Sequence, residues 1–198
     1  MLKHLPNALT LLRLVLAPVV AWAVWRAQLG DDKAWAIAAA ILFVIAALTD
    51  LFDGMVARAF NAESKFGRII DPIADKALVG LPLIALSILL YTKTWEFWPL
   101  VAGPTAVIVV RDVLMTGARL MAPDGEGARV SQLAKWKTAL ELIVVGGAVM
   151  FPLAPAVMGA NIDGALVLDA LAWLVWNSLL VVAAGLSAYT GVRYVVSK

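Results

Sequence analysis

The feature that most constrains this chain is a succession of apolar runs, each about as long as a bilayer is thick. A helix needs about 20 mostly apolar residues to cross the hydrocarbon core. The runs cover residues 7–28, 34–60, 66–91, 97–121, 131–153 and 166–196. The polar segments between them are too short to form a second domain. We therefore expect an all-α integral membrane protein, a six-transmembrane-helix bundle formed by one membrane-embedded domain over residues 1–198.

The composition agrees with a membrane protein. Hydrophobic residues make up 63% of the chain and charged residues 15%, whereas soluble domains are roughly half apolar and about one quarter charged. A net charge of +2 without a polybasic arm argues against nucleic acid as a partner. The chain has no cysteine and one histidine, His4, so it lacks the residues for a thiolate metal site and is poorly suited to a Ser-His-Asp triad.

The basic residues predict the orientation of the bundle. On the side with few of them are Arg26, Lys33 and Lys93. The opposite side collects Lys3, Arg58, Lys65, Arg68, Arg119, Arg129, Lys135, Lys137, Arg193 and Lys198. Cytoplasmic loops carry the excess of Lys and Arg, so the richer side is expected to face the cytoplasm. Six helices then place both termini in the cytoplasm, and we expect a multi-pass protein of the inner (cytoplasmic) membrane.

Four aspartates interrupt the second and third apolar runs, in the stretch TDLFDGMVARAFNAESKFGRIIDPIADK. Asp50 and Asp53 are three positions apart and Asp71 and Asp75 are four apart, so each pair shares one face of its helix. At a rise of 1.5 Å per residue, Asp50 lies about 24 Å from the outer end of its helix. Asp71 and Asp75 lie about 8 and 14 Å from the cytoplasmic end of theirs. All four carboxylates are therefore expected in the cytoplasmic third of the membrane.

The helices over 34–60 and 66–91 are joined by a short loop, so they are expected to be antiparallel neighbours. If they face each other, the four carboxylates converge and require a positive partner. Oxygen ligands favour hard cations such as Mg²⁺, Mn²⁺ or Ca²⁺, and four carboxylates suffice for two ions, an arrangement suited to displacement at phosphorus. Ionisable groups inside a membrane are functional by default. The structural alternative is that each aspartate pairs with Arg58, Arg68, Lys76 or Arg111.

The same residues form an extended motif. Asp50-Leu-Phe-Asp53-Gly54-Met-Val-Ala57-Arg58 is followed by Gly67, Asp71 and Asp75. This matches D-x2-D-G-x2-A-R-x8-G-x3-D-x3-D at every fixed position, and by it the chain resembles the CDP-alcohol phosphotransferase family. The six-helix frame is similar to that family along nearly the whole chain.

The resemblance implies an enzyme that transfers a phosphatidyl or similar group from a CDP-linked donor to an alcohol and releases CMP. It implies that Asp50, Asp53, Asp71 and Asp75 hold two divalent cations, Mg²⁺ or Mn²⁺, and that Asp75 is also the general base. It implies a homodimer and a set of contacts to the CDP donor: Asn7, Thr10, Gly54, Arg58, Ser64 and Gly67. The diphosphate of CDP-diacylglycerol would lie at headgroup level, where the aspartates are also expected.

A basic group further along the chain indicates an anionic acceptor. Arg111 lies about ten residues from the cytoplasmic end of its helix, or about 15 Å deep. Asp112 follows it but points about 100° away on an ideal helix, so an Arg–Asp pair is not assured. The positive-inside rule accounts for Arg129 but not for a cation as deep as Arg111. We expect a phosphate-binding pocket formed by Arg111, Arg119, Lys135 and Lys137.

The segments VVRDVLMTGARL and SQLAKWKT resemble those of the branch of the family that uses sn-glycerol 3-phosphate and yields phosphatidylglycerol phosphate. Asp112 stands where that branch usually has glutamate, and Glu141 where it usually has glutamine. The alternatives are phosphatidylglycerol as acceptor, as in cardiolipin synthesis, or another alcohol. A divalent-cation transporter is a remote alternative, because its carboxylates would be expected at the bilayer midplane rather than to one side.

Overall fold

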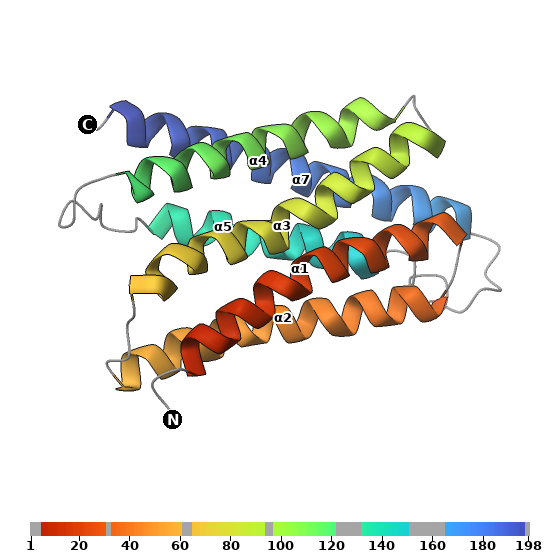
Figure 1. The fold of residues 1–198 in the computed structure, drawn as a ribbon. Helices are drawn as coiled ribbons and strands as arrows, with labels where there is room; N and C mark the ends of the chain where they lie inside the picture. The colour runs from red at the N-terminus through yellow and green to blue at the C-terminus, as the bar shows by residue number, and fades with distance from the viewer. Residues whose placement is uncertain are drawn as a thin grey trace.

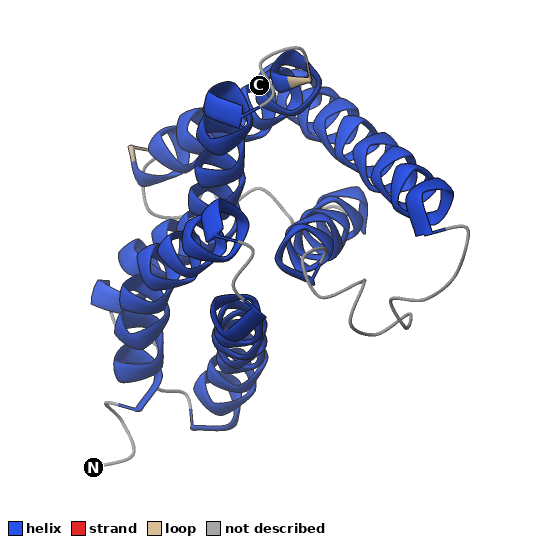
Figure 2. Ribbon diagram, turned by 90° about the vertical axis from the view of Figure 1, so that its right-hand side faces the viewer, coloured by secondary structure: helices blue, strands red, loops and turns tan. Residues whose placement is uncertain are grey.

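The structure of the protein is a computed structural model that describes residues 5–30, 33–60, 65–93, 97–121, 132–150 and 165–196. Within these ranges several side chains are not described, chiefly those of residues 51–60, 65–66, 68, 119, 134 and 165–170. The described chain forms the helices α1 (Leu5–Gly30), α2 (Lys33–Phe60), α3 (Lys65–Lys93), α4 (Trp98–Leu120), α5 (Gln132–Met150) and α7 (Ala165–Val196). Figure 2 shows these elements as helices, and no strand occurs in the described ranges. The all-α prediction is confirmed.

Five of the described helices are long and apolar enough to cross a membrane: α1, α2, α3, α4 and α7. Large apolar side chains are exposed on them, including Val15, Ile41, Val113, Leu114 and Val182. A soluble protein rarely exposes so much apolar surface, so the chain is a multi-pass membrane protein. α5 is not among the five, because Lys135, Lys137 and Glu141 lie in the first ten of its 19 residues. That α5 also spans the membrane remains a prediction.

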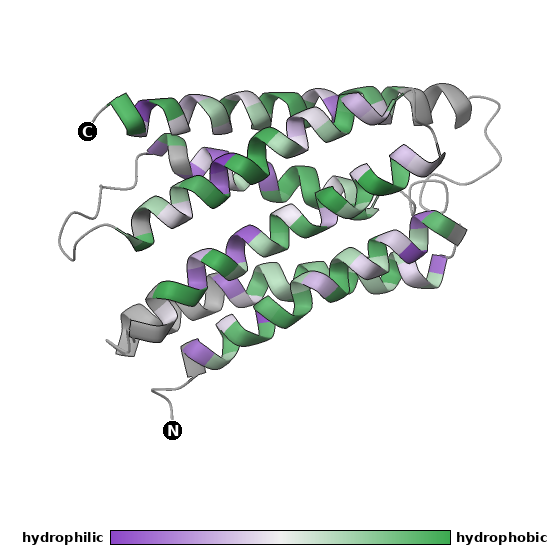
Figure 3. Cartoon of the chain, turned by 45° about the horizontal axis from the view of Figure 1, so that its top comes forward, coloured by the Kyte–Doolittle hydropathy of each residue, from purple (hydrophilic) through white to green (hydrophobic). Residues whose placement is uncertain are grey.

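The helices alternate in direction, so the first residues of some helices and the last residues of the others lie at the same end of the bundle. Figure 1 shows this end at the left, where α1, α3 and α5 begin and α2, α4 and α7 finish. Figure 3 shows many of the hydrophilic residues, in purple, towards the same end. We refer to it as the polar end of the bundle. It corresponds to the side that the sequence predicts to be cytoplasmic.

The neighbour relations of the first three helices differ from the prediction. α1 packs extensively against both α2 and α3, whereas α2 and α3 hardly touch each other (Figure 1). Small side chains on α1 permit this close approach, among them Ala17, Ala23 and Ala27, which are fully or almost fully buried. The helices α2 and α3 are antiparallel, but the condition that they face each other directly is not met in the described residues. A short loop brings two helices near each other but does not prevent a third from lying between them.

The remaining helices pack either on α3 or on the neighbours of α3. α3 contacts α4 and α5, and α7 packs against α4 and α5. Hydrogen bonds join α7 to both neighbours: Trp176 Nε1 donates to the Val144 carbonyl at 2.8 Å, and Asn177 Nδ2 donates to the Leu100 carbonyl at 3.1 Å. At Gly147 a Cβ atom would lie 2.9 Å from Trp176 Cδ1, so only glycine fits this crossing of α5 and α7 without a shift. This packing places α3 at the centre of the polar end.

Candidate functional site

Three of the predicted aspartates meet side chains of α1 near the polar end. The Thr10 hydroxyl donates a hydrogen bond to the carboxylate of Asp71. The Arg13 guanidinium contacts the carboxylates of Asp50, with an Nη1–Oδ1 distance of 2.6 Å, and of Asp75. Residues from α1, α2 and α3 thus form one group, which we call the carboxylate cluster: Thr10, Arg13, Asp50, Asp71 and Asp75.

Arg13 is the member of this cluster that the sequence analysis did not single out. Its side chain is 1% exposed, whereas the carboxylates of Asp50 and Asp75 are 40% and 38% exposed. The Arg13 side chain bridges α2 and α3 by contacting Asp50 and Asp75, so the two helices are linked through α1 rather than by direct contact. Two signals were present in the sequence: an arginine inside an apolar run is costly, and its spacing of three from Thr10 places both side chains on one face of the helix.

The carboxylate cluster contains part of the predicted site. Gly67, expected to contact the donor, is buried on α3, and Asn7 is half-buried near the start of α1. Asp53, Gly54 and Arg58 belong to α2, but their side-chain positions lie outside the described residues, as does Ser64 altogether. Among the described residues no group of three or more His, Cys, Asp or Glu side chains is arranged to hold a metal ion. The metal and donor assignments therefore remain predictions.

A second polar group surrounds Asp112 on α4. The Asp112 side chain, 5% exposed, accepts hydrogen bonds from Arg111 Nη1 at 2.8 Å and from Lys137 Nζ at 2.5 Å, and its Oδ2 lies 3.2 Å from Lys76 Nζ. Lys137 Nζ also lies 2.9 Å from Oε1 of Glu141, one helical turn further along α5. We call these five residues of α3, α4 and α5 the Asp112 cluster: Lys76, Arg111, Asp112, Lys137 and Glu141.

The ion pairs formed by the basic residues differ from those considered in the sequence. Arg111 does pair with Asp112 although the two are consecutive, because the long arginine side chain bends back to the carboxylate. Lys76 and Arg111, considered as partners of the membrane aspartates in the motif, both contact Asp112. Arg13 instead contacts two of the motif aspartates.

α7 covers the Arg111 side of the cluster. Arg111 Nη2 donates to the Thr190 hydroxyl at 3.0 Å, and Thr190 Oγ1 in turn donates to the carbonyl groups of Leu186 and Ser187. A Cβ atom at Gly191 would lie 3.1 Å from Arg111 Cγ, so the α7 backbone lies directly against this side chain. The guanidinium is thus oriented from two sides, by Asp112 and by Thr190.

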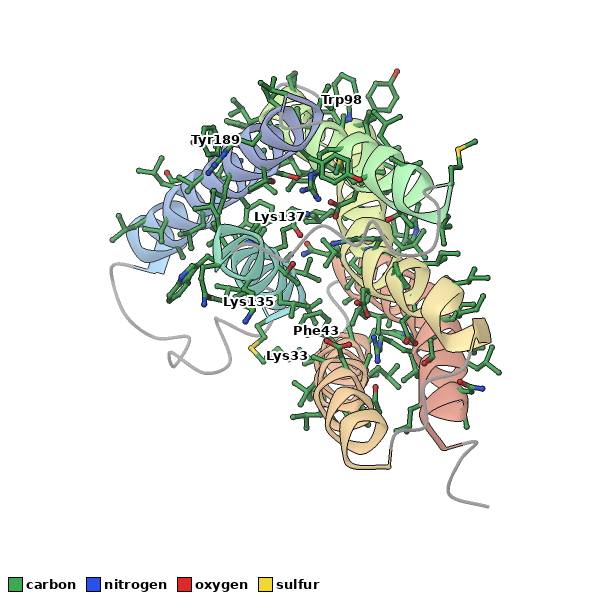
Figure 4. The ribbon with its side chains drawn as sticks, turned by 90° about the vertical axis from the view of Figure 1, so that its left-hand side faces the viewer. Lys33, Phe43, Trp98, Lys135, Lys137 and Tyr189 are labelled. Atoms are coloured by element: carbon green, nitrogen blue, oxygen red, sulfur yellow. The ribbon has the colours of Figure 1, made fainter. Side chains whose placement is uncertain are left out.

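The four residues predicted to bind the acceptor phosphate differ in their surroundings. Arg111 and Lys137 both point to Asp112, and Lys137 is 1% exposed. Lys135 is exposed, and Figure 4 shows Lys135 and Lys137 leaving α5 on different sides, as a separation of about 200° on a helix requires. Arg119 is in α4, but its side chain lies outside the described residues. The structure therefore brings together Arg111 and Lys137 and adds Lys76.

The two clusters meet on α3, where Asp75 and Lys76 are consecutive residues. Asp75 belongs to the carboxylate cluster and Lys76 contacts Asp112. One cluster offers carboxylate oxygens, which suit hard divalent cations. The other offers ammonium and guanidinium groups, which suit phosphate. The acidic and the basic cluster are therefore adjacent, joined through consecutive residues of α3.

Comparison with known proteins identifies the family. The family model for CDP-alcohol phosphatidyltransferase matches residues 3–183. Three bacterial relatives bear the name CDP-diacylglycerol–glycerol-3-phosphate 3-phosphatidyltransferase. That of Rickettsia felis is 35% identical over 97% of this chain and 93% of its own length. That of Bacillus subtilis is 37% identical over 72% of this chain and 74% of its own length.

The third relative, from Cereibacter sphaeroides, is 38% identical over 71% of this chain, and the match spans 61% of that protein's length. No solved structure matches the chain. The family match extends over most of the chain and includes every residue of both clusters. Thr190 and Gly191 of α7, which lie against Arg111, are beyond its end. The chain belongs to the CDP-alcohol phosphatidyltransferase family.

Proposed function

We propose that the protein transfers a phosphatidyl group from CDP-diacylglycerol to sn-glycerol 3-phosphate, giving phosphatidylglycerol phosphate and CMP. The observation that carries the proposal is the pairing of the carboxylate cluster with the Asp112 cluster through Asp75 and Lys76. The names of the relatives support the same donor and acceptor. A phosphate monoester carries about −1.5 to −2 charges at pH 7, which the half-buried Arg111 and the buried Lys137 would attract.

The carboxylate cluster fits the divalent cations that the motif implies. Asp50 and Asp75 already share one buried positive group, the Arg13 guanidinium, so their carboxylates are arranged around positive charge. Their donors are oxygens, which Mg²⁺ and Mn²⁺ prefer. In the proposal Asp50, Asp53, Asp71 and Asp75 hold two such ions. When bound, the ions would neutralise charge on the phosphoryl and leaving oxygens.

The protein's own groups then perform the transfer. Asp75 accepts the proton of the acceptor hydroxyl, whose oxygen forms the new bond to the β-phosphorus, the one that carries the diacylglycerol, while the bond from this phosphorus to the CMP oxygen breaks. Arg111 and Lys137, with Lys76 beside them and Arg119 further along α4, hold the phosphate of the acceptor and so orient its hydroxyl group. Donor contacts are assigned to Asn7, Thr10, Gly54, Arg58, Ser64 and Gly67.

The proposal also includes the setting of the enzyme. The polar end of the bundle faces the cytoplasm of an inner membrane, because the basic residues gather there. A water-soluble acceptor then arrives from the side where the donor's cytidine protrudes. The protein acts as a homodimer, as the resemblance implies, and cross-linking in native membranes would test this.

The test is a transfer assay with purified protein in detergent micelles. CDP-diacylglycerol and Mg²⁺ or Mn²⁺ are supplied, and CMP release is measured separately with glycerol 3-phosphate, phosphatidylglycerol, inositol phosphate and serine. We expect release with glycerol 3-phosphate, its loss in excess chelator, and a loss of at least about 100-fold in Asp75→Asn, as is usual for a positioned general base. Ser178→Ala, a substitution on an exposed part of α7, is the control.

The outcomes of the transfer assay distinguish between the alternative acceptors and reactions. Release only with phosphatidylglycerol would retain the chemistry and assign the acceptor of cardiolipin synthesis. Release in chelator equal to that with Mg²⁺ would refute the cation assignment. No release with any acceptor, from protein that is folded and binds Mn²⁺, would refute the proposed reaction and favour the transporter alternative.

A further inference from the structure

Glu141 is a buried carboxylate that neither the family motif nor the proposed reaction uses. Its side chain is 0% exposed, and among the described residues neither of its carboxylate oxygens accepts a hydrogen bond of good geometry. Its described partner is the ammonium group of Lys137, 2.9 Å from Oε1. Burying a carboxylate with so few partners costs free energy. Glu141 therefore lowers the stability of the fold, and a functional role would account for its presence.

Asp112 differs from Glu141 in how it is satisfied. Three cations surround Asp112, namely Lys76, Arg111 and Lys137. Asp112 would keep two of them if Lys137 turned to another anion. Glu141 would lose its described partner in the same event. Movement of the Lys137 ammonium group therefore destabilises Glu141 more than Asp112.

The charges of the Asp112 cluster set how strongly it attracts a further anion. Three cations against two carboxylates leave a net charge of about +1 in a largely dry site. A phosphate monoester brings about −1.5 to −2, so it is attracted by the cations and repelled by the carboxylates. With a neutral residue in place of Glu141, the same cluster would carry about +2.

We propose that Glu141 is an internal competitor of the acceptor phosphate: it holds Lys137 in the empty enzyme and thereby lowers the affinity for glycerol 3-phosphate. This inference rests on the proposed function, because it assumes that Lys137 binds the acceptor. Glu141 is a positioning residue that acts through Lys137 and touches neither substrate. Binding of the phosphate draws the ammonium group from Glu141, and release of the product returns it.

The experiment compares the wild type with Glu141→Gln, which keeps the size of the side chain and removes its charge. Removing one negative charge a few ångströms from a bound phosphate is expected to lower the KM for glycerol 3-phosphate about tenfold. The kcat and the KM for CDP-diacylglycerol should stay within about twofold, since transition-state contacts are unchanged. Inorganic phosphate, added as an inhibitor, should compete about tenfold more strongly in the variant.

A second variant keeps the proposal testable if Glu141→Gln does not fold. Glu141→Asp retains the charge but withdraws it from Lys137 by one methylene group, so its KM should lie between those of the other two proteins. An unchanged or raised KM in either folded variant would overturn the proposal and leave Glu141 with a structural role. A wild type that transfers nothing to glycerol 3-phosphate would instead refute the proposed function, so the two failures are distinguishable.

Discussion

Replacing Arg13 by methionine tests how the carboxylate cluster is held together. The substitution keeps a long side chain but removes the guanidinium that contacts both Asp50 and Asp75. The two carboxylates would then remain close to each other without the charge that lies between them. We expect a folded protein of lower stability, because the remaining interactions of α1 with α2 and α3 are extensive and apolar.

The magnitude follows from the burial of the three groups. Breaking a fully buried ion pair costs about 3–5 kcal/mol, because the remaining charge stays buried. An exposed pair contributes about 0–1 kcal/mol. Arg13 is buried, but the side chains of Asp50 and Asp75 are 40% and 38% exposed, so the carboxylates that remain are only partly enclosed by protein. We therefore expect a loss of about 2 kcal/mol, which for a chain of this length lowers the Tm by roughly 4–8 °C.

The assay is thermal unfolding in detergent micelles, followed by tryptophan fluorescence, with chelator and then with Mn²⁺. Arg26→Met is the matched control: it is the same change on the same helix, at an exposed position. The Arg26 guanidinium lies 5.8 Å from the centroid of the Trp35 ring, and an exposed cation–π contact contributes about 0.5–1 kcal/mol. Arg26→Met should therefore lose less stability than Arg13→Met. Since Mn²⁺ and the guanidinium would occupy the same carboxylates, Mn²⁺ should raise the Tm of Arg13→Met more than that of the wild type.

Two results would refute this reasoning. If Arg13→Met and Arg26→Met unfold at the same temperature in chelator, the guanidinium does not stabilise the cluster. If Mn²⁺ stabilises Arg13→Met no more than it stabilises the wild type, the ion and Arg13 do not compete for the same carboxylates. Either result would be obtained without measuring activity, so it would stand whatever the reaction is.

The Asp112 cluster and the α5–α7 crossing give two further predictions. Lys137→Met should raise the KM for glycerol 3-phosphate by about ten- to 100-fold, which is the contribution of one charge-assisted hydrogen bond. The same change at the exposed Lys135 should raise this KM less. Equal increases in the two variants, measured by steady-state kinetics, would contradict the assignment of Lys137 as the main phosphate contact of the two. Gly147→Ala should lower stability by about 1–3 kcal/mol, because the new methyl group meets the Trp176 ring. Gly103→Ala, where a Cβ meets nothing within 4 Å, is its control in thermal unfolding, and an equal Tm for both would show that the crossing accommodates the methyl group.

The sequence predicted the helices well because their signal is local. Apolar runs of more than about 20 residues can form little else in a membrane, and the described helices agree with the predicted ranges to within a few residues. The motif likewise placed Asp71 and Asp75 on one face of α3. Both inferences need only the spacing of residues along a single helix.

The sequence could not predict which helices are neighbours. Connection by a short loop suggested that α2 and α3 are in contact, but α1 lies against both and supplies Arg13. The order in which helices pack depends on small side chains and on many weak contacts, and the spacing of these residues along one helix does not say which other helix they contact. For the same reason the partners of Arg111, Lys76 and Lys137 could be identified only from the packed structure.

The position of α3 explains how two clusters of opposite chemistry can lie side by side. α3 is packed between α1 on one side and α4 and α5 on the other. Asp75 and Lys76 differ by about 100° around its axis and by about 1.5 Å along it, so one residue contacts Arg13 of α1 and the next contacts Asp112 of α4. The covalent geometry of one helix therefore fixes the distance between the acidic and the basic cluster. A reaction that joins a cation-bound diphosphate to a phosphate-bearing acceptor needs this distance to be constant, and a helix maintains it better than a loop would.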